Sequence, residues 1–307
     1  MKSKKLWIGL LMLLLILAGG CLSETREHSI VRENRYISNH PVLQVPHYWD
    51  KVPYAVADGE TLTLDISAPE GSGPFPVLMI IHGGGWELHT NTIMEGMARY
   101  ITNHGYVVFN INYRVRPNVP MEKIVEDCLG ALIWIKEHAA EYKGNPARIA
   151  VTGDSAGGHL TAMMVTQANN PAFHPTYPGA GKVDLSITCA APSYGVYNFT
   201  SLGKLVPSVT AKYLGAKPKQ DPERYQLLSP IFHVRKDLPP QLVIVGDLDP
   251  LYSANKAYVE ALKKVGAPVE FWVYHGQSHA FLNSFWSEKG TRGYDRIIAF
   301  LDKQLKQ

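Results

Sequence analysis

The stretch Gly153-Asp154-Ser155-Ala156-Gly157 decides the fold, because it fits the pattern G-x-S-x-G between two segments of different character. The apolar run Ile149–Thr152 precedes it, and the helix-like segment Gly158–Gln167 follows it. A strand, a sharp turn that glycines permit, and a helix form in this order a nucleophile elbow, which exposes the serine oxygen at the helix N-terminus. The context therefore predicts Ser155 as a nucleophile rather than as part of a plain glycine-rich turn.

Strand-like and helix-like segments alternate on both sides of this elbow. Continuous apolar runs are typical of strands covered on both faces, and they occur at Val77–Ile81, Tyr106–Ile111, Ile149–Thr152, Leu185–Ala191, Gln241–Val245 and Val269–Tyr274. Helical periodicity marks Met121–Tyr142, Ala254–Val265 and Gly293–Leu305. The alternation predicts an α/β protein with a mostly parallel central sheet flanked by helices.

Two segments depart from this alternation. Thr61–Ser67 alternates in polarity, so we expect an antiparallel strand at the start of the sheet. Residues 192–239 are rich in Gly, Pro, Ser and aromatic residues and are too long for a simple loop. We expect them to form a small cap insertion within a single α/β domain that spans residues 43–307.

A second glycine-rich motif, His82-Gly83-Gly84-Gly85-Trp86, follows the predicted strand Val77–Ile81. Successive glycines allow backbone N–H groups to approach a substrate carbonyl without obstruction by side chains. Donors of this kind stabilise the oxyanion of acyl transfer and contribute a factor of about 10² to 10³ each. We predict an oxyanion hole formed by the N–H groups of Gly84, Gly85 and Ala156.

A serine nucleophile needs a histidine base, and the base needs an acidic partner that holds its tautomer. In this type of fold the chain order is Ser, then Asp or Glu, then His. Asp249 follows the strand Gln241–Val245, and His279 follows the last strand, so both emerge where ligands bind in open α/β sheets. The competitors are Asp247 and His275. We prefer Asp249 and His279, because Asp247 suits a turn cap and His275 ends its strand with little loop to reach Ser155.

Together these residues resemble the hormone-sensitive-lipase-like branch of bacterial α/β-hydrolase esterases. The matching motifs are His82–Trp86, Gly153–Gly158, Asp249 within Gly246–Leu251, and His279 before Ala280-Phe281. The resemblance covers the chain from about Thr61 onward. It implies an α/β-hydrolase fold and a carboxylic ester hydrolase that acts on short acyl groups and uses no cofactor and no metal.

The run Gly73-Pro74-Phe75-Pro76-Val77, together with Trp86, is similar to a related branch. That branch includes bacterial feruloyl and acetyl-xylan esterases, which implies small-molecule or polysaccharide-linked esters as substrates. The segment Asn112–Pro117 departs from the corresponding stretch of the lipase-like branch. The departure concerns the acyl and alcohol pockets and leaves the triad unaffected.

Three other functions remain open at this stage. An amidase or exopeptidase would use the same triad on a nitrogen leaving group. A non-catalytic binding module of hydrolase ancestry would lack a triad residue, and none is missing. A metalloenzyme is suggested only by the spacing of His275 and His279, which would suit a metal ion on a helix but falls where we expect a strand and a loop. Aromatic residues of the predicted cap, such as Tyr194, Tyr197 and Phe199, either line the acyl site or form the core of the cap.

The N-terminus carries a targeting signal. Met1–Lys5 is basic and Leu6–Gly20 is almost wholly apolar, which is the layout of a secretory signal peptide. The run Leu17-Ala18-Gly19-Gly20-Cys21 resembles the bacterial lipoprotein signal. We expect residues 1–20 to be removed, Cys21 to be lipidated and residues 21–42 to form a tether. The mature protein would then be extracytoplasmic, either anchored to a membrane as a lipoprotein or secreted.

The charge of the chain points away from nucleic acid as a partner. The formal net charge of +3 comes from 30 basic and 27 acidic residues, and Lys2, Lys4 and Lys5 lie within the predicted signal peptide. Without those three lysines the basic and acidic residues are equal in number, so no basic footprint remains. We expect the two remaining cysteines, Cys128 and Cys189, to be buried free thiols. The alternative is a disulfide between them, which an extracytoplasmic location permits but no spacing supports.

Overall fold

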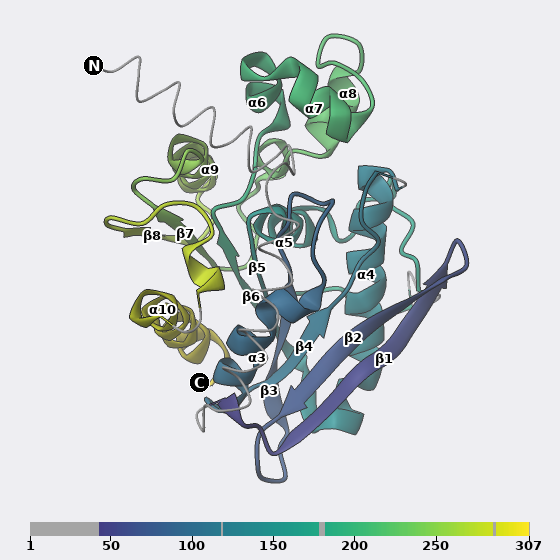
Figure 1. Cartoon of the computed structure of the whole chain (residues 1–307), viewed down its shortest axis with the longest axis vertical. Coiled ribbons are helices and arrows are strands. Elements are labelled where there is room, and N and C mark those ends of the chain that lie inside the picture. The colour runs from purple at the N-terminus through teal and green to yellow at the C-terminus, as the bar shows by residue number, and fades with distance from the viewer. Residues whose placement is uncertain (1–42, 118, 178–181, 285–286, 307) are drawn as a thin grey trace, which may run out of the picture.

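The central sheet has eight strands in the order β1-β2-β4-β3-β5-β6-β7-β8, and all pairs from β4 to β8 are parallel. The computed structural model describes residues 43–117, 119–177, 182–284 and 287–306. The predicted signal peptide, Cys21 and the tether lie outside these residues. The strands are β1 His47–Ala57, β2 Glu60–Ala68, β3 Phe75–Ile81, β4 Val107–Ile111, β5 Gly144–Asp154, β6 Cys189–Ser193, β7 Gln241–Gly246 and β8 Val269–Tyr274. This is the predicted mostly parallel sheet of an α/β-hydrolase fold (Figure 1).

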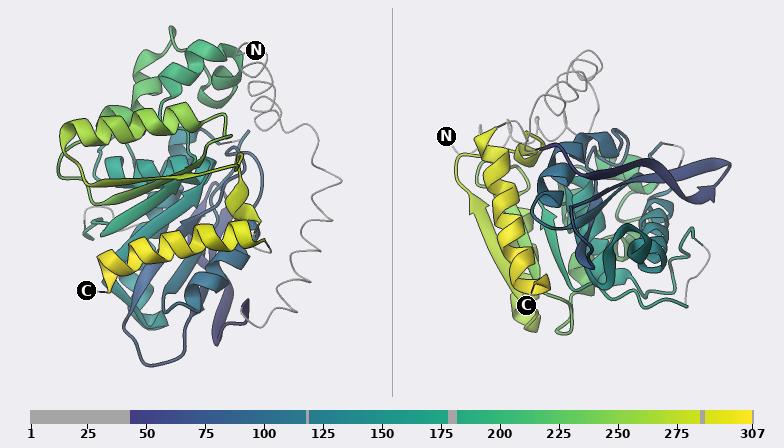
Figure 2. Two further views of the ribbon diagram at one scale, coloured as in Figure 1. Left: turned by 90° about the vertical axis from the view of Figure 1, so that its left-hand side faces the viewer. Right: turned by 90° about the horizontal axis from the view of Figure 1, so that it is seen from below.

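Helices cover both faces of this sheet (Figure 2). They are α3 Glu95–Thr102, α4 Met121–His138, α5 Ala156–Gln167, α6 Phe199–Leu205, α7 Pro207–Leu214, α8 Pro222–Leu227, α9 Tyr252–Val265 and α10 Glu288–Leu305. In β3, Val77 and Met79 belong to the core that α4, α5 and α9 share, whereas Leu78 and Ile80 belong to the core of α3 and α10. A strand with two buried faces reads as a continuous apolar run, which explains why the run was visible in the sequence.

One predicted strand needs correction, and one strand was missed. The expected strand Leu185–Ala191 begins only at Cys189 and continues to Ser193. The carboxylate of Asp184 accepts hydrogen bonds from the N–H and hydroxyl of Ser186, and this local turn delays the start of the strand. The first strand, β1, was not predicted, because it is an edge strand with register shifts and a mixed exposure pattern.

The cap insertion forms three short helices between β6 and β7, at the end of the molecule where the parallel strands finish (Figure 1). Asn198 caps α6 by accepting from Ser201 N, and Asp221 caps α8 by accepting from Arg224 N. Arg224 also forms a two-pronged ion pair with Glu122 of α4, at 2.7 Å for both contacts. These contacts tie the cap to the body of the protein.

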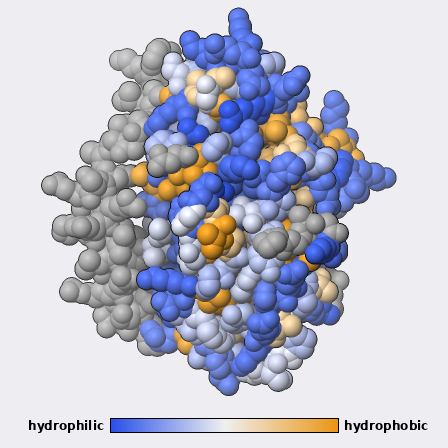
Figure 3. All heavy atoms as spheres, turned by 90° about the vertical axis from the view of Figure 1, so that its right-hand side faces the viewer, coloured by the Kyte–Doolittle hydropathy of each residue, from blue (hydrophilic) through white to orange (hydrophobic). Residues whose placement is uncertain are grey.

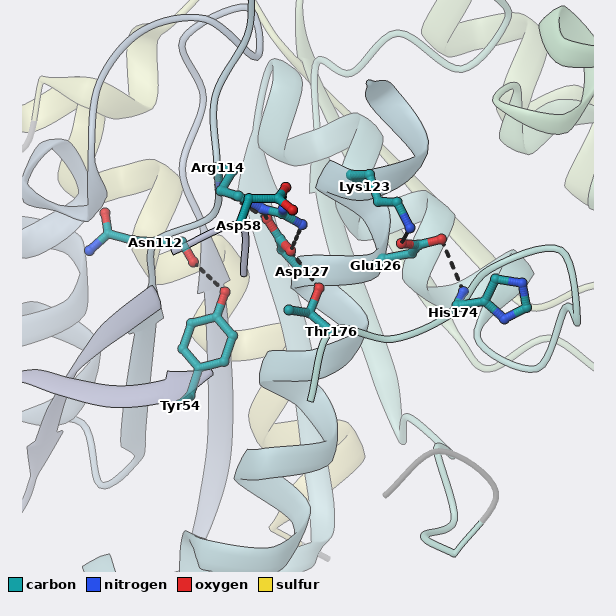
Figure 4. A network of polar contacts seen from close by, with 9 residues as sticks. All are labelled: Tyr54, Asp58, Asn112, Arg114, Lys123, Glu126, Asp127, His174 and Thr176. Carbon is teal, nitrogen blue, oxygen red and sulfur yellow. Dashed lines mark hydrogen bonds and ion pairs between the residues drawn. The ribbon is translucent and has the colours of Figure 1, made fainter. Parts of the chain in front are cut away.

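A buried ionic network fixes the loop that follows β4 (Figure 4). Arg114 is 4% exposed, and its guanidinium donates to both carboxylate oxygens of the fully buried Asp127 on α4. Asp58, in the turn between β1 and β2, contacts the same guanidinium at 2.5 Å. The network joins the edge hairpin, the loop after β4 and α4, so it stabilises the side of the sheet that carries the glycine-rich loop.

Large exposed hydrophobic side chains are dispersed over the surface, at Val56, Leu205, Phe232 and Leu248. Figure 3 shows one face on which hydrophobic residues occupy small areas among hydrophilic ones. Within the described residues, none of the helices combines the length and apolar character needed to cross a membrane. Cys128 and Cys189 are both free and buried.

Candidate active site

Ser155 lies in the sharp turn between β5 and α5. Its backbone has φ 52° and ψ −112°, a strained conformation for a residue with a side chain. Its N–H donates to the carbonyl of Ser193 at 3.0 Å. The turn requires Gly157, because a Cβ at that position would lie 2.0 Å from the carbonyl oxygen of Ile81. The predicted strand, turn and helix therefore occur as an elbow with Ser155 at its tip.

A continuous chain of hydrogen bonds joins the three residues predicted as the triad. His279 Nε2 is 2.8 Å from Ser155 Oγ, and His279 Nδ1 is 2.8 Å from Asp249 Oδ2. The side chain of Asp249 is fully buried and that of His279 is 6% exposed, so the pair is shielded from water. The second oxygen of Asp249 accepts from Leu251 N at 2.7 Å. This arrangement leaves Nε2 as the nitrogen that can take a proton from the serine.

The competing residues form a separate pair away from this chain. Asp247 Oδ2 is 3.1 Å from His275 Nδ1, and His275 is 87% exposed in its side chain. Asp247 Oδ1 also accepts from Gly276 N at 2.7 Å, so this carboxylate caps the turn after β8. The pair Asp247–His275 offers no route to Ser155, which agrees with the preference for Asp249 and His279.

The glycine-rich loop lies against the elbow through a buried carboxylate. Gly83 N donates to Asp154 Oδ1 at 2.7 Å, and a Cβ at Gly83 would lie 2.6 Å from Asp154 Oδ2. Burial raises the pKa of the Asp154 carboxyl, opposed by nearby groups that include His279. The hydrogen bond from the loop to Asp154 could not be found from sequence, because the two partners are 71 residues apart.

The backbone donors predicted for the oxyanion hole are free of acceptors among the described residues. Within the part of the chain that the structure describes, the N–H groups of Gly84 and Gly85 have no hydrogen-bond acceptor. Ala156 is the first residue of α5, so its N–H has no partner within the helix. Gly84 has φ 112° and Gly85 has φ 62°, both in the region that favours glycine. The predicted donors are thus unpaired and lie in the two turns that the Gly83–Asp154 hydrogen bond holds together.

Sequence reasoning missed the role of His159, one turn into α5. His159 Nδ1 accepts from the indole N–H of Trp86 at 3.2 Å, and its Nε2 donates to the carbonyl of Leu228 at 2.9 Å. Burial lowers the pKa of His159 to about 4, so the ring is neutral at pH 7. The histidine therefore links the glycine-rich loop, the elbow helix and the cap. The sequence signal was a histidine in a helix that is mostly apolar.

The three aromatic residues considered for the acyl site are all fully buried. The ring of Tyr194 lies 5.0 Å from that of His279, Tyr197 stacks on Tyr258, and Phe199 packs on Trp86. Tyr194 therefore supports the histidine, whereas Tyr197 and Phe199 belong to the core beneath the cap. The described residues contain no cluster of three or more His, Cys, Asp or Glu side chains that could hold a metal ion.

Comparisons with known proteins agree with this geometry. The probable carboxylic ester hydrolase LipM of Mycobacterium tuberculosis is 34% identical over 222 residues, which cover 68% of this chain and 50% of LipM. The chain thus spans about half the length of this relative. The structure of a hyperthermophilic esterase from the archaeon Pyrobaculum calidifontis has a TM-score of 0.74 at 23% identity and covers 95% of this chain and 97% of that one.

A truncated carbohydrate esterase from gut microbiota has a TM-score of 0.73 at 22% identity and covers 86% of this chain and 98% of that one. At such identities the structural likeness shows the fold alone. The BD-FAE family model matches residues 64–262, a range that contains the glycine-rich loop, the elbow and Asp249. Since this match covers more than half of the chain, the protein belongs to the BD-FAE family and has the α/β-hydrolase fold.

Proposed function

We propose that this protein is a serine carboxylesterase that hydrolyses short-chain carboxylic esters through an acyl-enzyme. The observation that carries the proposal is the hydrogen-bond chain from Asp249 through His279 to Ser155, with 2.8 Å at each contact to the histidine. Relatives named as a carboxylic ester hydrolase and an esterase support the same reaction class. No cofactor is needed, because the nucleophile, base and oxyanion donors all belong to the chain.

The reaction follows from the positions of these groups. His279 Nε2 takes the proton of Ser155 as Oγ attacks the ester carbonyl, and Asp249 stabilises the resulting imidazolium. The oxyanion is bound by the N–H groups of Gly84, Gly85 and Ala156. The imidazolium then protonates the leaving alcohol as the C–O bond breaks, leaving an acyl group on Ser155. Water repeats the sequence, releases the acid and regenerates the serine.

The test is hydrolysis of acetyl, butyryl and octanoyl p-nitrophenyl esters by the purified full-length chain in mild detergent. We expect turnover of the short esters, and a loss of several orders of magnitude in kcat for Ser155→Ala with unchanged circular dichroism. Unchanged activity of the variant would refute the assignment of Ser155 as the nucleophile. Cleavage of the corresponding p-nitroanilides in place of the esters would point to an amidase.

We further propose acyl groups on plant polysaccharides, acetyl or feruloyl, as the natural esters. Support comes from the BD-FAE family match and from the gut-microbial carbohydrate esterase, whose fold is similar. Release of acetate from acetylated xylan and of ferulate from methyl ferulate distinguishes the two acyl groups. An enzyme that hydrolyses the p-nitrophenyl esters but neither of these substrates would contradict this assignment.

We also propose that the chain is attached to an extracytoplasmic membrane face through lipid on Cys21. The basic and apolar segments before Cys21 support this proposal. Metabolic labelling with a radioactive fatty acid should mark the protein, and Cys21→Ser should abolish the label and move the protein out of the membrane fraction. A labelled Cys21→Ser variant would disprove lipidation at this residue.

A further inference from the structure

The two sides of the elbow carry different parts of the site. In the sheet, β7 and β8 lie on one side of β5, and β3 lies on the other. Asp249 and His279 follow β7 and β8, whereas the glycine-rich loop and Trp86 follow β3. The leaving oxygen of an ester must approach His279 to receive its proton, so the alcohol part lies toward β8. The carbonyl oxygen of the same carbon points to the N–H groups of Gly84, Gly85 and Ala156, and we place the acyl chain on that side of the elbow, next to Trp86.

Trp86 closes that direction. Its side chain is 1% exposed, and its ring centroid lies 5.4 Å from His159, 5.4 Å from Phe199 and 5.3 Å from Tyr213. Phe199 and Tyr213 belong to α6 and α7 of the cap. A large, fully packed indole at this point fills the space that a long acyl chain would need.

Space is open immediately before this residue. Apart from its two chain neighbours, no heavy atom lies within 4 Å of a Cβ placed on Gly85. The change from open space at Gly85 to dense packing around Trp86 occurs within one residue. An acyl group placed beside Gly85 would therefore meet open space first and the packed indole of Trp86 next.

Hydrogen bonds fix both the side chain and the backbone of Trp86, the residue that would form the wall of the acyl site. The indole N–H donates to His159 Nδ1, and the other nitrogen of that ring donates to the cap carbonyl of Leu228. The backbone carbonyl of Trp86 accepts from Arg116 N at 2.8 Å. Because His159 is neutral and makes both hydrogen bonds, it keeps the indole in one orientation. The wall is therefore rigid rather than adaptable.

We propose that Trp86, fixed by His159 and the cap, is the residue that limits the length of the acyl group accepted by Ser155. This inference rests on the proposed esterase function and names its substrate class as esters of short acids. It identifies Trp86 as a specificity-determining residue and His159 as the positioning residue behind it.

The experiment compares Trp86→Ala with Trp134→Ala, a matched control in which the same residue type is removed from α4. Trp134 is also buried, at 7% exposed, but it packs against Phe109 and Tyr142. For Trp86→Ala we expect the ratio of kcat/KM for octanoyl to acetyl p-nitrophenyl esters to rise by about tenfold or more. For Trp134→Ala the ratio should stay within about twofold of the parent, even if stability falls.

A second readout separates this inference from the proposed function. Methyl and octyl p-nitrophenyl phosphonates label a nucleophilic serine without any turnover, so the ratio of their labelling rates reports the size of the site directly. Trp86→Phe, which keeps an aromatic ring in the core, serves if Trp86→Ala does not fold. An unchanged octyl-to-methyl labelling ratio in a folded Trp86 variant would refute the proposal that Trp86 limits the length of the acyl group. Labelling of Ser155 without hydrolysis of any ester would refute the esterase function while the ratio still tests Trp86.

Discussion

Replacing Asp249 by asparagine should lower kcat for a short p-nitrophenyl ester by about 10⁴-fold, with little change in KM. The carboxylate accepts two hydrogen bonds, from Leu251 N at 2.7 Å and from His279 Nδ1 at 2.8 Å. An asparagine amide has one oxygen and one NH₂ group, so only one of these two N–H donors can still find an acceptor. The other N–H would face the NH₂ group, which is itself a donor. If the NH₂ faces His279, the ring must carry its proton on Nε2, and it can no longer accept the proton of Ser155.

The expected loss corresponds to about 5.4 kcal/mol of activation free energy. This value is plausible for the site, because the Asp249 side chain is fully buried and bulk water therefore does not compensate for the loss of its negative charge. Initial rates with p-nitrophenyl butyrate measure the effect, and circular dichroism verifies that the variant is folded.

The chain provides its own control in Asp247→Asn, two residues earlier. Asp247 pairs with the exposed His275 and has no contact with the triad, so this variant should keep activity within about twofold. The reasoning is refuted if Asp249→Asn loses less than about tenfold, or if the two variants lose activity equally.

Three further outcomes follow from other parts of the structure. Burial lowers the pKa of His82 and of His159 from 6.5 to about 4, so between pH 6.5 and pH 4 the unfolded chain binds more protons than the folded chain. The free energy of unfolding should therefore fall as the pH drops, by about 4 kcal/mol between pH 7.5 and pH 5 for the two residues together. Urea unfolding of His159→Gln should show a smaller fall over this pH range than the parent. Gly84→Ala should lose about 10²-fold or more in kcat, because φ is 112° and the new Cβ would lie 2.2 Å from the carbonyl oxygen of Leu88; parent-like rates would contradict this. Arg114→Met leaves a fully buried carboxylate uncompensated and should cost about 3 to 5 kcal/mol of unfolding free energy in urea melts, and a loss below about 1 kcal/mol would show that the network adds little.

The sequence determined the fold class and the candidate residues, because both depend on short-range patterns. Strands buried on two faces are visible as apolar runs, and a glycine-rich turn between a strand and a helix is visible as G-x-S-x-G. Asp249 and His279 could be proposed because they follow predicted strands, and the carboxyl ends of parallel strands meet at one edge.

Local patterns failed where pairing is long-range. The edge strand β1 has a mixed exposure pattern, so its pairing with β2 is not encoded in a simple alternation. Strand β6 starts at Cys189 rather than Leu185, because a side-chain turn at Asp184 competes with the ladder.

Only the tertiary structure decided which charged residues pair and what lies behind the glycine-rich loop. From sequence, Asp247 and Asp249 differ by two positions, yet one is a surface cap and the other is a fully buried partner of His279. The indole N–H of Trp86 donates a hydrogen bond to His159, 73 residues away, and His159 donates to a cap carbonyl a further 69 residues along the chain. Such contacts depend on the direction of each side chain after the whole sheet has formed, and no local periodicity carries that information.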